Sequence, residues 1–223
     1  EVVVVDKHDY HTFQPMLYQV ATDLLPAETV AHPLRDLFHD QPNARVHKAS
    51  VTAIDLDKRE VQFGEMDALT YDYLVLALGA EVNYFGVEGA AEHAFPMYTL
   101  PHAVRLKEHI LERWEATDKD TSLVDDGALN VVVVGGGPTG VESAGAVAEL
   151  YRSLFVQDYP DIPQEKAADT PTFLDRSLVT VAPNVTLDRY QYTGTYHGVV
   201  HSHLDAVDCH IMVDGKGYNG VSV

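Results

Sequence analysis

The chain has 223 residues, 46% of them hydrophobic, and a mean hydropathy of -0.12, which is typical of a globular protein. This length accommodates one large α/β domain or two small ones. The net charge of -19 repels nucleic acid and anionic membrane surfaces, so no nucleic-acid partner is expected. A single cysteine, Cys209, excludes both an internal disulfide framework and a redox-active cysteine pair.

The acidic excess has two interpretations. It gives general solubility, or it reflects adaptation to a concentrated-salt cytoplasm in which ions screen the self-repulsion. The sequence holds no long apolar run of the length that spans a membrane. It opens directly on an apolar strand, so no signal peptide is expected and this fragment alone is expected to be soluble.

Several elements are predicted in the first third of the chain. Residues 1–6, Glu-Val-Val-Val-Val-Asp, predict a parallel strand that is buried on both faces. Residues 33–39 predict a short helix with Leu34, Leu37 and Phe38 on one side.

A hairpin and a further strand are predicted next. Residues 46–56 and 60–63 predict two strands that are joined by a turn at 57–59. Residues 71–78, Tyr-Asp-Tyr-Leu-Val-Leu-Ala-Leu, predict another buried strand, which Gly79 closes.

A long helix follows. Residues 102–116 predict an amphipathic helix with Ala103, Leu106, Ile110 and Trp114 on one face. The polar stretch 117–129 predicts a linker.

Residues 131–142, Val-Val-Val-Val-Gly-Gly-Gly-Pro-Thr-Gly-Val-Glu, are the most informative stretch of the chain. Gly135, Gly137 and Gly140 form a G-x-G-x-x-G fingerprint between a predicted strand and a helix that runs to about Phe155. The glycines permit a tight turn, the approach of a pyrophosphate and close packing of helix on strand. The alternative is a glycine turn in an ordinary βα unit.

The helix after the fingerprint has small residues at helical spacing. Val141, Ala144, Gly145 and Ala148 are predicted to pack against the sheet. The free N–H groups at the start of the helix would hold phosphates, so the predicted nucleotide contacts are Gly135, Gly136, Gly137, Pro138, Thr139 and Gly140.

Three blocks together resemble a type II NADH dehydrogenase, the single-subunit, non-proton-pumping NADH:quinone oxidoreductase. They are residues 6–21 (Asp-Lys-His-Asp-Tyr-His-Thr-Phe-Gln-Pro-Met-Leu-Tyr-Gln-Val-Ala), 71–80 and 135–145. The resemblance extends to about Lys166. It implies an α/β, FAD/NAD(P)-binding, Rossmann-like three-layer fold with two nucleotide-binding units, both incomplete here. FAD would bind the first unit and NADH the second, and a quinone would accept the electrons.

The resemblance assigns roles in the FAD unit residue by residue. Asp6 would accept hydrogen bonds from the adenosine ribose, or it caps a helix or turn. Lys7 would touch the adenine edge or is solvated. Val51 lies in a strand whose backbone would meet the adenine. Leu78 and Gly79 match a turn near the FAD phosphates, although Leu78 replaces the usual threonine.

Glu142 is the residue that the resemblance places in the chemistry. It lies two residues after the last fingerprint glycine, on the first turn of the helix. There it would reach the nicotinamide–flavin junction and serve hydride geometry or quinone protonation. Alternatively, the macrodipole of the helix stabilises it without any catalytic role. The resemblance places Gln14, Pro15 and Gln19 where the chain of the family passes the flavin and quinone region. Alternatively, these residues have a buried structural role.

The chain departs from the family at two places. An FAD unit has its own fingerprint about 20 residues before the strand-ending acid, and residue 1 already lies in the strand that Asp6 ends. Later, Ala182 stands where an acid for the NADH ribose is expected. We therefore expect a partial FAD-binding domain at 1–116, a linker at 117–129, a partial NADH-binding domain at 130–183 and an unassigned tail at 184–223.

The tail contains His201, His203 and Asp205, whose spacing resembles part of a metal site. A solvated tail is the preferred interpretation, and no metal is expected. The alternative to an active oxidoreductase is a truncated, inactive nucleotide-binding remnant. The family also implies peripheral contact with the cytoplasmic face of the cell membrane, through segments outside this chain, and is compatible with a homodimer.

Overall fold

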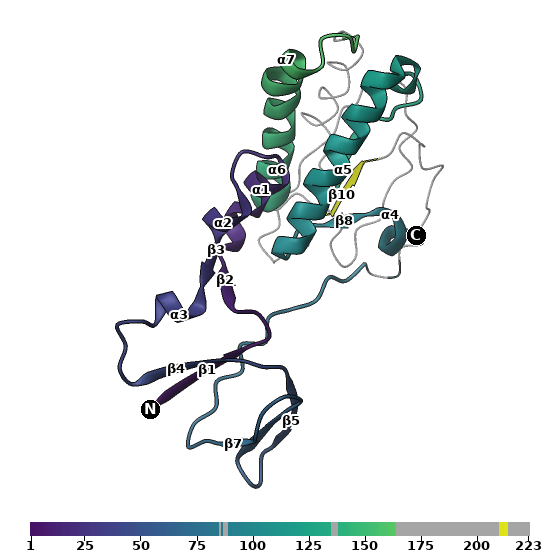
Figure 1. Ribbon diagram of the computed structural model, residues 1–223. Helices are drawn as coiled ribbons and strands as arrows, with labels where there is room; N and C mark the ends of the chain where they lie inside the picture. Colours follow the sequence, from purple (N-terminus) through teal and green to yellow (C-terminus); the bar gives the residue numbers. More distant parts are fainter. Residues whose placement is uncertain (85, 87–88, 135–137, 164–209, 214–223) are drawn as a thin grey trace. The chain divides into compact units, whose positions relative to one another are not determined.

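The computed structural model describes residues 1–84, 86, 89–134, 138–163 and 210–213 (Figure 1). The chain divides into two compact units. Unit 1 comprises Glu1–Phe13 and Glu28–Glu81, and unit 2 comprises Gln14–Ala27 and Val82–Val223. This division does not coincide with the linker predicted at 117–129, which lies inside unit 2, where Thr117 and Leu129 are buried.

The first strand of unit 1, β1 (Val2–Asp6), pairs in parallel with β4 (Ala44–Lys48). The strand and its parallel pairing are confirmed. Burial on both faces is wrong, because Val2 and Val3 are 51% and 41% exposed. Among the described residues β4 is the only strand that pairs with β1, so one edge of β1 has no described neighbour.

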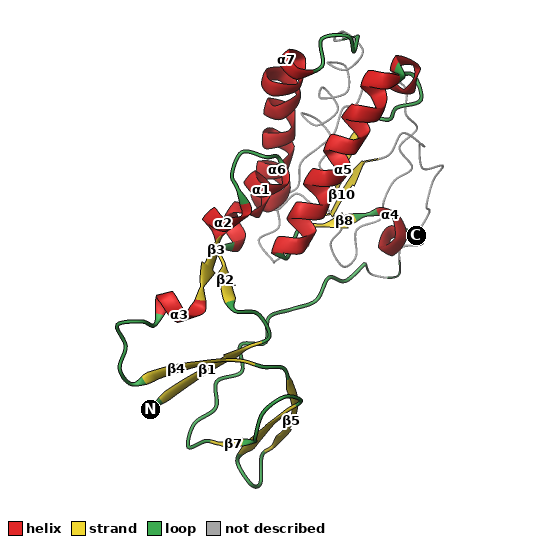
Figure 2. Cartoon of the chain, in the orientation of Figure 1, coloured by secondary structure: helices red, strands yellow, loops and turns green. Residues whose placement is uncertain are grey.

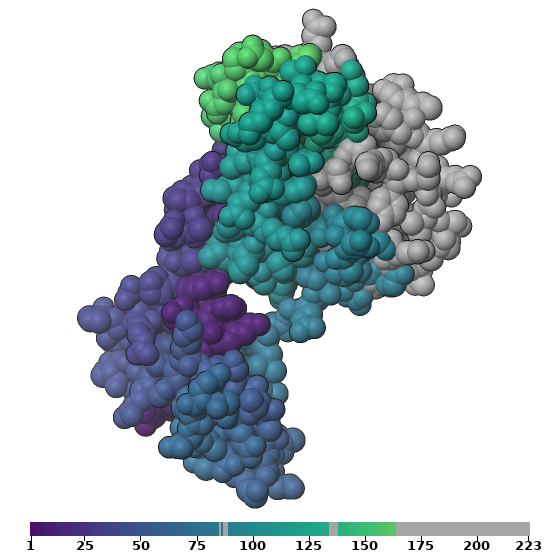
Figure 3. Space-filling view, turned by 45° about the vertical axis from the view of Figure 1, so that its right-hand side comes forward, coloured from purple at the N-terminus to yellow at the C-terminus, as the bar shows by residue number. Residues whose placement is uncertain are grey.

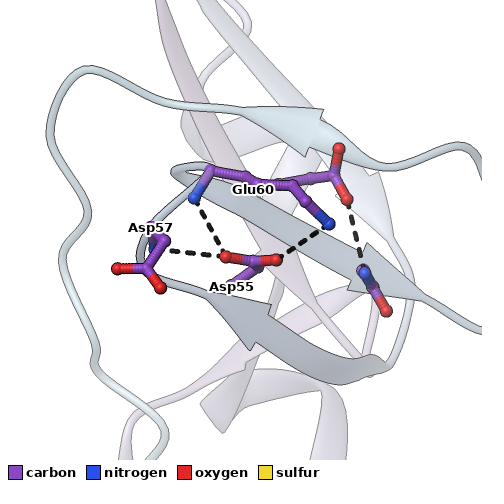
Figure 4. A network of polar contacts seen from close by, with 5 residues as sticks. Asp55, Asp57 and Glu60 are labelled. Carbon is purple, nitrogen blue, oxygen red and sulfur yellow. Dashed lines mark hydrogen bonds and ion pairs between the residues drawn. The ribbon is translucent and has the colours of Figure 1, made fainter.

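The predicted hairpin is present as β5 (Val51–Asp55) and β6 (Glu60–Phe63), with β7 (Leu69–Thr70) added beside β6. Figure 4 shows the turn, in which Asp55 Oδ1 accepts hydrogen bonds from the backbone N–H groups of Asp57 and Lys58 at 3.1 and 2.9 Å. The Lys58 ammonium lies 3.1 Å from Asp55 Oδ2. The single strand predicted over 46–56 is instead two strands, β4 and β5, that belong to different sheets.

Two short strands, β2 (Tyr10–Thr12) and β3 (Ala31–Pro33), form an antiparallel pair. The short helices α2 (Ala27–Val30) and α3 (Leu34–Leu37) flank β3. The helix predicted near 33–39 is confirmed as α3, but Leu37 is exposed and only Leu34 is buried. A helix of about one turn presents too little surface to bury all three predicted side chains.

The predicted strand at 71–78 is not formed. Tyr73 and Val75 are 93% and 85% exposed, and no described strand pairs with this segment. A buried parallel strand needs a hydrogen-bonding neighbour and cover on both faces. The described residues supply neither here, so this apolar sequence remains irregular.

Unit 2 is built on helix α5 (Leu100–Lys119), which Figure 3 shows in teal with its outer face open to solvent. Thr99 caps the helix, and the face predicted from the sequence is confirmed. Ala103, Leu106, Ile110 and Trp114 are all at most 1% exposed. The spacing of apolar residues predicts the buried face correctly here because the helix is long and one face is uniformly apolar.

The fingerprint helix packs against α5 through an aromatic cluster. It begins as α6 (Pro138–Glu149), continues as a π-helical segment, Leu150–Phe155, and ends as α7 (Val156–Asp158). The Trp114 ring lies 4.9, 4.4 and 5.5 Å from the ring centroids of Tyr151, Phe155 and Tyr159. The Tyr151 hydroxyl donates to the carbonyl oxygen of Leu129 at 3.1 Å, and burial raises the pKa of Tyr151.

The remaining helices in the described part of unit 2 are short. They are a 3-10 turn at Gln14–Met16, α1 (Leu17–Ala21), α4 (Ala90–His93) and a 3-10 turn at Thr121–Val124. No helix in the described parts of the chain is long and apolar enough to cross a membrane.

The sheet of unit 2 has the order β8 (Phe95–Pro96), β10 (His210–Val213), β9 (Val131–Val134). Figure 2 labels two of these strands, β8 and β10. The predicted fingerprint strand is confirmed as β9. Its described neighbour β10 runs antiparallel to it, whereas a Rossmann-like unit has parallel strands. α6 contacts β9, and α5 contacts β8 and β10.

Candidate functional site

The fingerprint lies between β9 and α6, as the strand–turn–helix pattern predicts. Gly135, Gly136 and Gly137 lie outside the described residues. Pro138 is the first residue of α6, a position where its missing N–H removes no helical hydrogen bond. Thr139 is half-buried and Gly140 is buried.

The face that α6 buries differs from the predicted stripe. Ala144 and Ala148 are buried as expected, but Val141 is 51% exposed and Gly145 is exposed. A Cβ placed on Gly145 would meet no atom within 4 Å, so close packing does not require glycine there. The buried face is instead formed by Gly140, Ser143, Ala144, Ala146, Val147 and Ala148.

Residues 17–21 pack on the fingerprint helix as α1, which contacts both α5 and α6. The second part of the 6–21 block therefore belongs to the same unit as the fingerprint, whereas residues 6–13 belong to unit 1. The Gln14 amide, Nε2, donates to the carbonyl oxygen of Tyr98 at 2.9 Å. The Lys107 ammonium lies 2.9 Å from Asp23 Oδ1 and holds the residues after α1 to α5. Sequence reasoning did not predict this packing.

Two polar groups on α1 and α6 are buried without a hydrogen-bond partner in the described structure, Gln19 Oε1 and Ser143 Oγ. Leaving such a group unsatisfied costs about 1–3 kcal/mol, so it marks a place where a ligand or water would be accepted. Ser143 was not singled out from the sequence. The sequence does contain a pattern that indicates Ser143. Its hydroxyl follows Gly140 by three residues, which places both residues on the same face of the fingerprint helix.

Glu142 is the fifth residue of α6 and is exposed. The prediction placed Glu142 on the first turn of the helix, but the residue lies just beyond that turn. No acidic side chain occupies the first turn. The macrodipole acts mainly within the first turn, which weakens the purely electrostatic alternative. The Glu142 carboxylate forms no hydrogen bond or ion pair with a described residue, so it is available to a ligand.

On the FAD side, Asp6 ends β1 and is half-buried. Its Oδ1 accepts a hydrogen bond from the backbone N–H of His8 at 2.7 Å, which is the turn cap that the sequence left open as an alternative. A carboxylate has further acceptor positions, so this bond does not exclude ribose binding. Lys7 is exposed.

Val51 begins β5 and is 38% exposed. It lies close to Asp6, because Asp6 is paired with Lys48 and the backbone N–H of Ala49 donates to the Asp6 carbonyl at 2.9 Å. Leu78 is 76% exposed, and Gly79 has a φ of +76°, a conformation that favours glycine.

The two sets of predicted nucleotide contacts lie in separate units. Asp6, Lys7, Val51, Leu78 and Gly79 belong to unit 1, and the fingerprint belongs to unit 2. The predicted tail cluster of His201, His203 and Asp205 lies outside the described residues, as does Ala182. Within the described ranges no group of three or more His, Cys, Asp or Glu side chains is placed to hold a metal ion.

The sequence pattern of the pyridine nucleotide-disulphide oxidoreductases matches residues 1–204. Among curated proteins, the type II NADH:quinone oxidoreductase NdhA of Mycobacterium tuberculosis is 40% identical over 154 residues, which are 67% of this chain and 33% of NdhA. The type II NADH:quinone oxidoreductase Ndh of the same organism is 34% identical over 75% of this chain and 37% of its own length. The chain thus spans about a third of the length of these relatives.

Solved structures show the same fold. NDH2 of Plasmodium falciparum in complex with RYL-552 superposes with a TM-score of 0.68 at 23% identity, covering 74% of this chain and 35% of the other. NDH2 of the same organism in complex with NADH gives a TM-score of 0.67 at 23% identity, with the same coverage of both chains. From the pattern that matches nearly its whole length, the chain belongs to the pyridine nucleotide-disulphide oxidoreductase family.

Proposed function

We propose that this chain is part of an FAD-dependent oxidoreductase that passes a hydride from NADH to FAD and the electrons on to a membrane quinone. The observation that carries the proposal is the packing of α1 on the fingerprint helix α6, which brings Leu17–Ala21 beside the helix of a nucleotide-binding motif. The 40% identity to a type II NADH:quinone oxidoreductase supports the same reaction.

NADH is assigned to unit 2. Its pyrophosphate would be held by the turn and helix start at Gly135, Gly136, Gly137, Pro138, Thr139 and Gly140. The described part of this set fits the assignment, because Gly140 is buried on the fingerprint helix and this helix runs on for more than three turns. Ser143 Oγ, buried without a partner, is a further donor on this helix.

FAD is assigned to unit 1. Asp6 would bind the adenosine ribose, Lys7 and the Val51 backbone would lie at the adenine, and Leu78 and Gly79 would lie near the phosphates. The proximity of Asp6 to the start of β5 supports the shared adenosine contact. Residues 1–116 would then contribute to FAD binding and residues 130–183 to NADH binding, a functional division that differs from the two compact units.

Glu142 is the proposed catalytic residue. Its carboxylate is exposed, unpaired with any described residue, and one turn along the helix that would receive the NADH phosphates. FAD supplies the hydride-accepting chemistry when bound. Glu142 would orient the reacting rings or hold a proton destined for the quinone.

The proposal extends to location and assembly. We propose that the whole protein is a peripheral enzyme at the cytoplasmic face of the cell membrane, where it would reach a quinone dissolved in the membrane, and that it assembles as a homodimer.

The proposal is tested on the full-length protein that contains this sequence. Purified protein should be yellow, bind FAD in titration and oxidise NADH when a quinone analogue is present. A colourless protein that binds no added FAD would instead establish the second candidate, an inactive nucleotide-binding remnant.

A further inference from the structure

The β2–β3 pair of unit 1 places two histidines opposite each other. His11 on β2 and His32 on β3 are direct register partners in this antiparallel pair. Both side chains are exposed. Opposed residues of antiparallel strands stand on the same face, with Cβ atoms about 4.5–5.5 Å apart.

The backbone on both sides fixes this register. The N–H of Phe13 donates to the Val30 carbonyl at 2.8 Å, and the N–H of Leu34 donates to the Asp9 carbonyl at 2.8 Å. These bonds lie two residues before and after the histidine pair on each strand, so a one-residue slip would break both of them. Val30, at one end of the pair, is completely buried and anchors it.

Neither imidazole has a competing partner among the described residues. His11 and His32 form no hydrogen bond, ion pair or ring contact there. The neighbouring groups are engaged elsewhere, since His8 stacks on Tyr10 at 5.2 Å and Asp9 Oδ2 lies 3.0 Å from the Lys48 ammonium. Both rings are therefore available to an external ligand.

We propose that His11 and His32 chelate a divalent late transition-metal ion of the zinc type, whose other coordination positions are taken by water. Zinc–nitrogen bonds of about 2.0–2.1 Å put two tetrahedral nitrogen ligands about 3.4 Å apart. Two imidazoles on opposed Cβ atoms can reach that separation by side-chain rotation alone. No third His, Cys, Asp or Glu of the described chain completes the set, so the site is open and exchangeable.

This site is independent of the proposed oxidoreductase function. It uses neither the fingerprint nor the residues assigned to FAD, and it requires no bound nucleotide.

The test is calorimetric titration of the purified chain with Zn²⁺, using His11→Gln, His32→Gln and the double variant. A chelate needs both ligands, so each single variant should weaken the tightest zinc binding on the order of 100-fold, and the double variant should weaken it no further. The matched control is His39→Gln combined with His93→Gln, which removes two exposed imidazoles that are not opposed. The control should retain the tight binding step.

Circular dichroism should show an unchanged fold in every variant, because the substituted side chains are exposed. Zinc should also raise the unfolding midpoint of the parent chain and of the control, but not of the two single variants. The proposal is overturned if either single variant binds zinc within threefold of the parent, or if the control loses as much affinity as the double variant.

Discussion

The role proposed for Glu142 rests on its position in α6 as well as on its charge. It projects from α6 at its fifth residue, between the buried positions Gly140 and Ser143, yet it is itself exposed and unpaired within the described structure. With 34 acidic and 15 basic residues, many surface carboxylates of this chain have no cationic partner, so the lack of a partner alone does not mark Glu142. Its position on the fingerprint helix is the reason for the proposed role.

At the residue scale, Glu142→Gln in the full-length protein should lower kcat roughly tenfold or more and leave the FAD content intact. The substitution keeps the shape and removes the charge and the proton. Steady-state NADH oxidation with a quinone analogue measures kcat, and the flavin absorption measures cofactor content.

Glu149→Gln is the matched control, because Glu149 is also exposed on α6 and lies two turns further along. Its turnover should equal that of the parent. Equal turnover in both variants would remove Glu142 from the mechanism.

At the element scale, α5 illustrates why some predictions succeed. Its apolar positions recur with helical period from Ala103 to Trp114, over about three turns, and each of the four predicted side chains is buried. The segment 71–78 is equally apolar but lacks a described strand to pair with, so its composition alone does not make a strand. The contact of α1 with α6 depends on tertiary packing that no local pattern encodes.

The aromatic cluster that joins α5 to the end of the fingerprint helix gives a stability prediction. Trp114 is completely buried, so Trp114→Ala should lower the free energy of unfolding by about 3–5 kcal/mol. Trp114→Phe should cost clearly less, since it keeps a ring against Phe155 and removes an indole N–H that has no hydrogen-bond partner in the described structure. Urea unfolding measures both, and equal losses would contradict this role of the ring.

The start of α5 gives a pH prediction. Thr99 Oγ accepts from the N–H of His102 at 3.4 Å, and His102 Nδ1 accepts from the N–H of Thr99 at 3.3 Å. Partial burial, and then the Arg105 charge, lower the pKa of His102 below its ordinary value of 6.5. The neutral ring is therefore the stabilising form. Its contribution is complete above pH 6.5 and is lost as the pH falls through the lowered pKa.

His102→Gln tests this, because glutamine accepts the same bond at every pH. The stability of the parent should decline relative to His102→Gln as the pH falls from about 7 to about 5. Urea unfolding of both proteins over this range is the measurement. A difference that does not change with pH would show that the ring nitrogen does not cap the helix.

At the scale of the whole molecule, the most prominent property is the large negative net charge. With 34 acidic and 15 basic residues, the compact state repels itself, and salt should relieve that repulsion. If the acidity reflects a concentrated-salt cytoplasm, the unfolding midpoint should rise steadily from low to molar potassium chloride. A midpoint that does not change across the series would leave general solubility as the explanation.

The central claim is that NADH delivers a hydride to a flavin held by this chain and that a quinone removes the electrons. Its most direct test is rapid anaerobic mixing of the full-length protein with NADH, followed by a quinone analogue. We predict that NADH bleaches the flavin absorption band and that the quinone analogue restores it. A flavin band that NADH leaves unchanged would contradict the account.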